Sequence, residues 1–352
     1  MYSRVPVVIP SYEPDDRLPQ LCRDLYAAGI EDIILIDDGS GPRFREIFDG
    51  LEKEYPLTVL RHAVNLGKGR ALKDAFNYLL NRDEAMIGCV TADSDGQHTP
   101  ADIGRMIAAL EKHPDSLILG CRDFDADNVP FKSKAGNKIT CRVCKWIAGV
   151  GVSDTQTGLR AIPRDFMAYL LGVAGERFEF EMNMLVETRD RCPVREIKIE
   201  TVYDSKENHT THFHPVRDSI RIYRIFGAMF LKFVFSSLSA SVVDLAAFHF
   251  LSLWLQPLSP AWYITIATVA ARILSSLYNY TVNYVFVFES NENKGKSLVK
   301  YYAVAAAKLA LSALFVTLGS KFFPGTASVV IKMVVDTALF FAGYRIQREL
   351  VF

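Results

Sequence analysis

The sequence predicts an α/β domain followed by an all-α membrane domain. Up to about residue 225, short apolar, β-branched runs alternate with stretches of helical periodicity. After that point charged residues become sparse and the apolar stretches become long. The first pattern is typical of a mostly parallel sheet covered by helices on both faces, and the second of helices that cross a bilayer. We therefore expect a first domain at residues 1–225 and a second at residues 226–352.

Charge balance, the N-terminal residues and the cysteine spacing argue against three functional classes: nucleic-acid-binding, secreted and zinc-binding proteins. The 40 Lys+Arg residues balance the 40 Asp+Glu residues, so net charge indicates no nucleic-acid partner. The apolar run after Arg4 is short and interrupted by prolines, unlike a signal peptide, and the first domain is therefore expected in the cytoplasm. Cys141 and Cys144 form a lone CxxC pair without two further ligands nearby, which favours one face of a helix over a zinc site.

Five apolar runs in the first domain are predicted to be strands. Helical periodicity separates consecutive runs, and the last run is expected to close the series. The runs, each given with the turn that follows it, are 5–12, 32–40, 56–63, 86–96 and 116–123.

Polar clusters follow three of these strands, at Pro10–Glu13, Asp37–Ser40 and Asp93–His98. In parallel sheets the carboxyl ends of the strands share one edge, where ligands bind. Carboxylates gathered there repel one another unless a cation offsets their charge. Carboxylate oxygens suit Mg²⁺ or Mn²⁺, which proteins usually hold together with substrate phosphates. The alternative is that Asp and Gly simply favour turns.

The stretch "NLGKGRAL" at 65–72 is similar to a phosphate-binding P-loop but does not fit that motif. Lys68 is followed by Gly69 rather than Ser or Thr, and position 62 is histidine rather than glycine. Its glycines are expected to open a helix whose N-terminal amides face the same sheet edge.

Six motifs in order, "IPSYEP", "DDGS", "NLGKGRA", "ADSDGQH", "GCRDF" and "DTQTGLRAI", resemble the family 2 glycosyltransferases over roughly residues 4–225. The polyprenyl-phosphate sugar synthases are the most similar branch. The resemblance implies a GT-A fold and inverting transfer of a hexose, glucose or mannose, from a UDP- or GDP-sugar to polyprenyl phosphate. The QxxRW signature of processive synthases is absent from the sequence.

The resemblance also implies roles for individual residues. "ADSDG" corresponds to the family's DxD motif, so Asp93, Asp95 and Gln97 would hold Mg²⁺ or Mn²⁺, and Asp93 would also face the donor. Asp93, Asp95 and Arg122 are the expected catalytic residues. The remaining donor-side residues are Pro10, Tyr12, Glu13, Asp37, Asp38 and Lys68. Glu13–Pro14 stands where the family usually has Asn-Glu, a departure that affects recognition of the base.

The acceptor would not require a general base. A phosphate monoester has its second pKa near ~6, so at neutral pH it is already mostly a dianion. The site must instead supply positive charge. The candidates are Arg122, Lys132, Lys134 and Arg160. A guanidinium can grip phosphate bidentately, and the resemblance places an arginine at Arg122. The alternative is that these cations pair on the surface with Asp123, Asp125 or Asp127.

Four segments in the second domain reach the ~20 residues that a spanning helix needs. The predicted spans are about 229–255, 261–288, 299–322 and 327–346. Lysines and arginines precede the first span, fill the loop at 289–300 and follow the last, whereas the loop at 256–260 carries no charge. The positive-inside rule therefore places both termini and the catalytic domain on the cytoplasmic side of the cell membrane.

Several ionisable residues fall within these spans, among them Asp244, Arg272, Lys308 and Asp336. Each costs roughly 2.5–3.5 kcal/mol at the bilayer centre, so pairing or a polar cavity is expected, with snorkelling as the alternative. With "NYTVNYVFVF" at 279–288, this half resembles the GtrA-like membrane proteins, which implies handling of lipid-linked sugars for cell-envelope glycans. A lipid-linked sugar flippase with a nucleotide-binding domain is the alternative function, and a homo-oligomer remains open.

Overall fold

The computed structural model describes residues 3–82, 84–124, 131–189, 191–200, 215–323, 325 and 327–352. The chain divides into two compact units, Met1–Ile225 and Phe226–Phe352. Each unit is described by itself.

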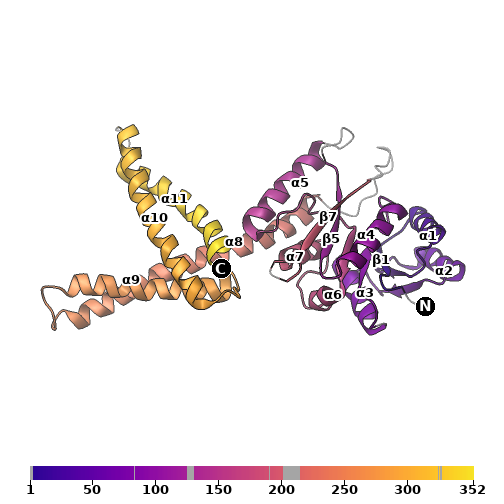
Figure 1. Ribbon diagram of the computed structural model, residues 1–352, viewed down its shortest axis with the longest axis horizontal. Helices are drawn as coiled ribbons and strands as arrows, with labels where there is room; N and C mark the ends of the chain where they lie inside the picture. Colours follow the sequence, from indigo (N-terminus) through magenta and orange to yellow (C-terminus); the bar gives the residue numbers. More distant parts are fainter. Residues whose placement is uncertain are drawn as a thin grey trace. The chain divides into compact units, whose positions relative to one another are not determined.

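The first unit is built on a seven-stranded sheet with the order β3-β2-β1-β4-β6-β5-β7 (Figure 1). Its strands are β1 (Val7–Ser11), β2 (Ile33–Asp37), β3 (Thr58–Arg61), β4 (Gly88–Thr91), β5 (Leu117–Arg122), β6 (Arg160–Pro163) and β7 (Val194–Ile199). All pairings are parallel except those of β6, which runs antiparallel to both β4 and β5. The sheet is therefore mixed, with one reversed strand near its centre.

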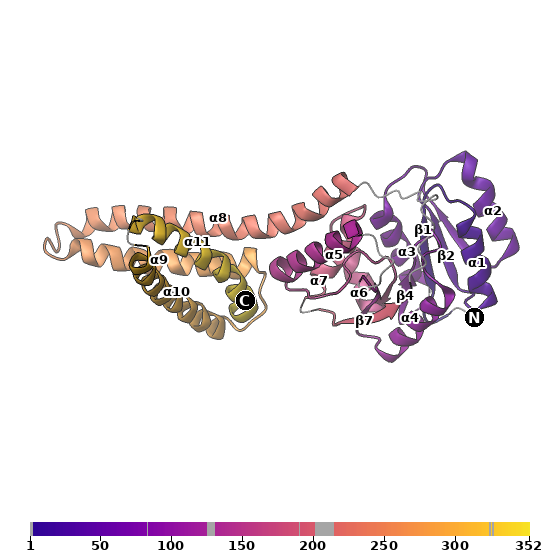
Figure 2. The same ribbon diagram turned by 90° about the horizontal axis from the view of Figure 1, so that it is seen from above.

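Helices cover both faces of this sheet (Figure 2). They are α1 (Arg17–Ala27), α2 (Arg45–Glu54), α3 (Lys68–Arg82), α4 (Pro100–Lys112), α5 (Phe131–Val143), α6 (Arg164–Leu170) and α7 (Glu179–Glu187), with a 3₁₀ turn η1 (Pro42–Phe44) and a π-helical turn η2 (Cys144–Ala148). Alternate residues such as Val7 and Ile9 pack against α1, α2 and α4, because side chains in a strand point to opposite faces. Helices α3 and α6 lie against the other face.

The strand series does not close at β5, contrary to the sequence-based prediction. Strand β6 has only four residues and ends in Pro163, so it lacks the length and the alternation that identify a strand. Strand β7 is an edge strand whose exposed charged residues dilute its apolar signal. The insertion of β6 beside β4 brings the "TGLR" segment next to the turn that carries Asp93.

The second unit is all-helical. Its helices are α8 (Pro215–Leu255, which begins in the first unit), α9 (Tyr263–Val282), α10 (Lys294–Phe322) and α11 (Ser328–Ile346), and the π-helical segments η3 (Asn283–Val287) and η4 (Gln347–Val351) follow α9 and α11. Large apolar side chains such as Phe235 and Leu309 are exposed, as expected of helices that face lipid. Among the described residues, Ile220–Leu255 and Lys294–Phe322 are long and apolar enough to cross a membrane.

The second unit contains an internal repeat that the sequence-based reading did not detect. Helix α8 packs beside α9 and α10 beside α11 (Figure 2), and each second helix ends in a π-helical segment. Asn283 Nδ2 donates to Gln347 Oε1 at 3.2 Å, and the two residues are 64 positions apart. The same offset relates Tyr280, Val287 and Phe288 to Tyr344, Val351 and Phe352.

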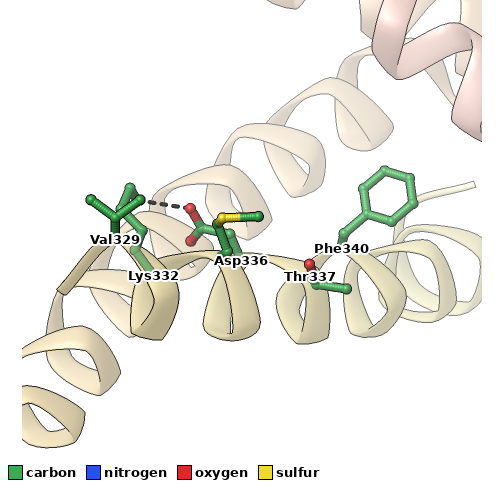
Figure 3. A pocket seen from close by; sticks show the side chains of 6 residues that line it. Val329, Lys332, Asp336, Thr337 and Phe340 are labelled. Atoms are coloured by element: carbon green, nitrogen blue, oxygen red, sulfur yellow. Dashed lines mark hydrogen bonds and ion pairs between the residues drawn. The ribbon is translucent and has the colours of Figure 1, made fainter. Parts of the chain in front are cut away.

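The ion pairs expected for Asp244 and Asp336 are present. Asp244 accepts a hydrogen bond from Ser275 Oγ at 2.8 Å and pairs with Arg272 at 3.2 Å. Asp336 accepts one from Ser312 Oγ at 2.6 Å and pairs with Lys332 at 2.8 Å. The second pair lies in a pocket of about 570 Å³ along α11 (Figure 3).

The repeat also relates the charged positions. With the offset of 64 residues, Asp244 in the first hairpin is equivalent to Lys308 in the second, and Arg272 is equivalent to Asp336. The charges are thus exchanged between the two hairpins, whereas the positions are the same. Asp244 pairs across its hairpin with Arg272, whereas Asp336 pairs with Lys332 of its own helix, so each hairpin offsets the charge of its aspartate in a different way.

Candidate active site

The turn after β4 carries Asp93, whose carboxylate meets two other elements. Lys68 Nζ, at the first residue of α3, lies 2.7 Å from Asp93 Oδ1. The same ammonium lies 2.9 Å from Oε1 of Glu181, in the first turn of α7. One lysine therefore bridges two carboxylates that are 88 positions apart in the sequence.

These contacts set the charge states of the cluster. Burial opposes ionisation of Asp93, but Lys68 and His98 outweigh it and hold the pKa of this carboxyl well below its usual range. Burial likewise disfavours the charged form of Lys68, yet its two carboxylate partners raise the pKa above the ordinary value. For Asp95, burial and then the nearby Asp93 raise the pKa. An added cation beside Asp95 would relieve this repulsion.

Gly158 allows the Asp93 turn to pack against β6. A Cβ at Gly158 would overlap with the Asp93 carboxylate. Thr91 Oγ1 donates to the Gly158 carbonyl at 2.9 Å and fixes the two segments side by side. His98, also buried, places Nε2 at 3.5 Å from Asp93 Oδ2. The position of Asp93 is thus determined by groups on β4, β6 and α3.

The residues expected to bind the donor gather at the ends of β1 and β2. Ser11 pairs with Asp37 in the sheet, and Pro10, Tyr12 and Glu13 flank Ser11 in the chain. Asp37 accepts a hydrogen bond from the Ser40 amide at 2.9 Å, and Ser40 Oγ accepts one from the Glu13 amide at 2.9 Å. Glu13 has φ of 48°, a left-handed conformation that is uncommon for a non-glycine residue.

Asp38 organises the neighbouring loop. Its Oδ1 accepts from the Leu66 amide at 2.9 Å and lies 2.8 Å from His62 Nδ1, and its Oδ2 accepts from the Gly67 amide at 2.8 Å. Both oxygens are therefore engaged within the protein. Asp38 thus fixes the loop that leads into Lys68, and its expected contact with the donor stays a prediction.

The three expected metal ligands lie in one turn, and their oxygens suit a hard divalent cation. Asp95 Oδ1 accepts from the Gln97 amide at 3.1 Å, which fixes the turn. Within the described part of the chain, no group of three His, Cys, Asp or Glu side chains could hold a metal ion. A divalent ion here would be held by the oxygens of this turn and, once the donor is bound, also by oxygens of its phosphates, as Mg²⁺ sites commonly are.

Arg122, at the end of β5, is anchored by Asp154. Its Nε and Nη2 donate to Asp154 at 2.8 and 3.1 Å, and Asp154 is fully buried. The guanidinium also lies 4.9 Å from the centre of the Phe124 ring. Its side chain is 20% exposed. Asp125 and Asp127 lie outside the described residues.

The other acceptor candidates fall in two groups. Lys134, on α5, is partly exposed, whereas the side chain of Lys132 is outside the described part of the structure. Arg160 does not fit an acceptor contact, because it is 1% exposed and donates to the backbone carbonyls of Thr157 at 2.9 Å and Glu181 at 2.7 Å. Its guanidinium ties β6 to α7.

The sequence-based reading missed four residues of this site: His98, Asp154, Gly158 and Glu181. Three of them lie in motifs quoted above, "ADSDGQH" and "DTQTGLRAI", without having been given a role. Glu181 lies in "RFEFE", and only the packing of α7 against the start of α3 reveals its importance.

The sheet with its polar strand ends and the apolar helices define an α/β protein joined to a helical unit of the kind that spans a membrane. Residues 7–167 match the family described as Glycosyl transferase family 2. Residues 232–352 match the family described as GtrA/DPMS, transmembrane domain. The chain thus contains a family 2 glycosyltransferase domain followed by a GtrA/DPMS transmembrane domain.

Several known proteins are similar to this chain. The UDP-N-acetylglucosamine–dolichyl-phosphate N-acetylglucosaminyltransferase of Methanococcus voltae is 27% identical over 219 residues, 56% of this chain and 85% of that protein. The polyprenol monophosphomannose synthase of Mycolicibacterium smegmatis is 28% identical over 171 residues, 47% of this chain and 63% of that protein. The crystal structure of S. aureus TarS 1–349 with UDP-GlcNAc covers 99% of this chain and 91% of that chain, with 14% identity and a TM-score of 0.42.

Proposed function

We propose that the chain transfers a hexose, glucose or mannose, from a UDP- or GDP-sugar to polyprenyl phosphate at the cytoplasmic face of the membrane. The observation that carries this proposal is the presence, in one chain, of a family 2 glycosyltransferase domain and a transmembrane domain. The names of the two relatives above, which act on dolichyl phosphate and polyprenol, support a lipid phosphate as the acceptor.

On the donor side, Asp93, Asp95 and Gln97 would hold Mg²⁺ or Mn²⁺. When bound, this ion would neutralise the charge that develops on the departing diphosphate. Lys68, with its ammonium beside Asp93, supplies positive charge next to the same group. The nucleoside would lie near the ends of β1 and β2, at Tyr12, Glu13 and the backbone around them.

On the acceptor side, the nucleophile arrives as a phosphate dianion. Arg122 would bind its oxygens, and the bidentate contact with Asp154 fixes the direction of the guanidinium. An oxygen of the lipid phosphate then bonds to the anomeric carbon as the bond to the donor diphosphate breaks, and the nucleoside diphosphate leaves. Attack opposite the leaving group inverts the anomeric centre. The proton balance needs no side-chain base.

The second unit would anchor the enzyme in the cell membrane with four spanning helices and both termini in the cytoplasm. The lipid-linked sugar made there would serve the modification of cell-envelope glycans. The flippase alternative is not favoured, because the first unit is a glycosyltransferase domain.

Transfer by the full-length chain in lipid nanodiscs tests this proposal. UDP-glucose, UDP-N-acetylglucosamine and GDP-mannose are each supplied with Mn²⁺ and polyprenyl phosphate, and lipid-linked sugar is measured by mass spectrometry. We expect one donor to give a glycolipid whose anomeric configuration, read by NMR, is opposite to that of the donor. Hydrolysis of donors without any lipid product, or retention of configuration, would refute it.

A further inference from the structure

Glu181 has no role in the chemistry proposed above, yet it belongs to the same charge cluster as Asp93. Its side chain is 10% exposed, and its Oε1 lies 2.9 Å from Lys68 Nζ. It is an acidic residue brought to the site from α7, far from Lys68 in the sequence. A buried carboxylate is costly unless it is paired, and Lys68 provides that pairing.

The cluster contains more carboxylates than neighbouring ammonium groups. Lys68 is shared between Asp93 and Glu181, with Asp95 on the same turn as Asp93. In an isolated Lys68–Asp93 pair the two charges would neutralise each other. A divalent ion would then have to displace the lysine to reach the Asp93 carboxylate. A second carboxylate gives the ammonium a partner to retain when Asp93 turns to a metal ion. Burial strengthens each of these charge interactions.

The junction that carries Lys68 and Glu181 is tightly packed. A Cβ at Gly69 would approach the Cβ of Phe180 to 2.5 Å, so the first turns of α3 and α7 are in direct contact. The Arg70 amide donates to the Glu176 carbonyl at 2.9 Å. The backbones that carry the lysine and the glutamate are therefore fixed relative to each other, and only the side chains can exchange partners.

We propose that Glu181 is a positioning residue that retains Lys68 when a divalent cation and the donor diphosphate take over Asp93. Before the donor binds, Lys68 neutralises Asp93. When the metal ion arrives, Asp93 turns to the metal, Glu181 holds the lysine beside it, and the ammonium faces the diphosphate. This inference rests on the proposed function only for the metal ion and the phosphate-bearing donor, and does not involve the acceptor.

Binding of Mn²⁺ alone to the full-length protein in nanodiscs tests the inference, with electron paramagnetic resonance reporting free Mn²⁺. Glu181→Gln keeps the size of the side chain and removes its charge. We expect the Mn²⁺ dissociation constant to rise roughly ten-fold, equivalent to about 1.4 kcal/mol, because Lys68 then stays on Asp93. Lys68→Met should lower the dissociation constant, because it removes the competitor for Asp93.

The double variant separates an action through Lys68 from a direct one. In the Lys68→Met background, Glu181→Gln should change the Mn²⁺ dissociation constant by less than about three-fold. An equal weakening in both backgrounds would mean that Glu181 acts on the metal directly, and no weakening in either would remove its role; both results overturn the inference.

A matched control lies at the same junction. Glu176→Gln breaks the pair between Glu176 and Lys73, which is 3.0 Å long and separate from Asp93, and should leave Mn²⁺ binding unchanged. A loss of Mn²⁺ affinity in this control equal to that of Glu181→Gln would overturn the specific role of Glu181. Because no acceptor is present, failure of this inference is distinguishable from failure to transfer sugar to polyprenyl phosphate.

Discussion

At the scale of single residues, the two aspartates of "ADSDG" differ in what the fold provides for them. Asp93 is paired with Lys68 and approached by His98, whereas Asp95 is stabilised chiefly by a backbone amide. The opposite pKa shifts of the two carboxyls follow from this difference. Asp95 is the residue with unused capacity to accept a metal ion.

Asp95→Asn should lower transfer by roughly 100-fold or more, because a neutral amide cannot offset the charge of a metal ion beside a diphosphate. The fold should survive, since a turn after a strand tolerates asparagine. Turnover with and without Mn²⁺ is the measurement, with circular dichroism to verify folding. Full activity of the folded variant in the absence of divalent metal would contradict the assigned role.

Arg122→Ala should lower transfer roughly 100-fold while the affinity for the donor changes little, because the guanidinium is assigned to the acceptor phosphate. Asp154→Asn, which leaves Arg122 in place and weakens its anchor, should give a smaller loss, seen mainly in the acceptor KM. Steady-state kinetics with both substrates varied distinguishes the two. If donor binding fell as far as transfer in Arg122→Ala, the arginine would belong to the diphosphate side.

At the scale of elements, strand β6 controls the geometry of the site although it has only four residues. Its antiparallel insertion between β4 and β5 places Gly158 against Asp93 and sends Arg160 into the interior. An apolar signal this short does not stand out in the sequence.

Gly158→Ala should displace the Asp93 carboxylate, because the new methyl group has no space beside it. We expect a strong loss of transfer and a cost of about 1–3 kcal/mol in the free energy of unfolding, typical of overpacking. Gly104→Ala is the matched control, since a Cβ there meets nothing within 4 Å. Thermal unfolding and turnover of both variants provide the comparison. Wild-type activity of Gly158→Ala would show that the turn is more adaptable than the packing indicates.

The repeated hairpins of the second unit make a second prediction at this scale. Asp244→Arg should destabilise the protein, because it faces Arg272 with a like charge at the position of a 3.2 Å ion pair. Adding Arg272→Asp restores a pair with the charges exchanged, the order of signs that the sequence has at the equivalent positions Lys308 and Asp336. Thermal unfolding in detergent should show a coupling of at least about 1 kcal/mol. Additive losses would argue against pairing.

At the scale of the whole molecule, the chain joins a glycosyltransferase unit to a helical unit. Residues 1–225, expressed alone, should fold and bind the donor nucleotide, because the sheet and its core are complete within this unit. Turnover of membrane-embedded polyprenyl phosphate should fall, because the transmembrane domain concentrates the enzyme on the bilayer. A short water-soluble acceptor serves as the control, and should be used equally by both forms. If residues 1–225 turned over the embedded acceptor as fast as the full-length chain, the transmembrane domain would not act by concentrating the enzyme on the bilayer.

The sequence by itself determined the fold class, the polar strand ends and the nature of the second half. These features depend on residues close together in the chain, since periodicity identifies strands and helices and turn residues mark their ends. The roles predicted for the turn at Asp93–Gln97 and for Arg122 came from the family resemblance, which likewise depends on short motifs. Composition alone separated the charged first half from the apolar second half.

Tertiary structure alone decided which of these residues meet. The Lys68 ammonium meets Glu181 only because α7 packs on the start of α3. Arg122 meets Asp154 only because β6 inserts antiparallel beside β5. The burial of Arg160 was not predicted for the same reason: a cationic side chain favours the surface, but β6 places it in the core. The order of strands and the packing of helix ends depend on contacts between distant segments, which local patterns do not encode.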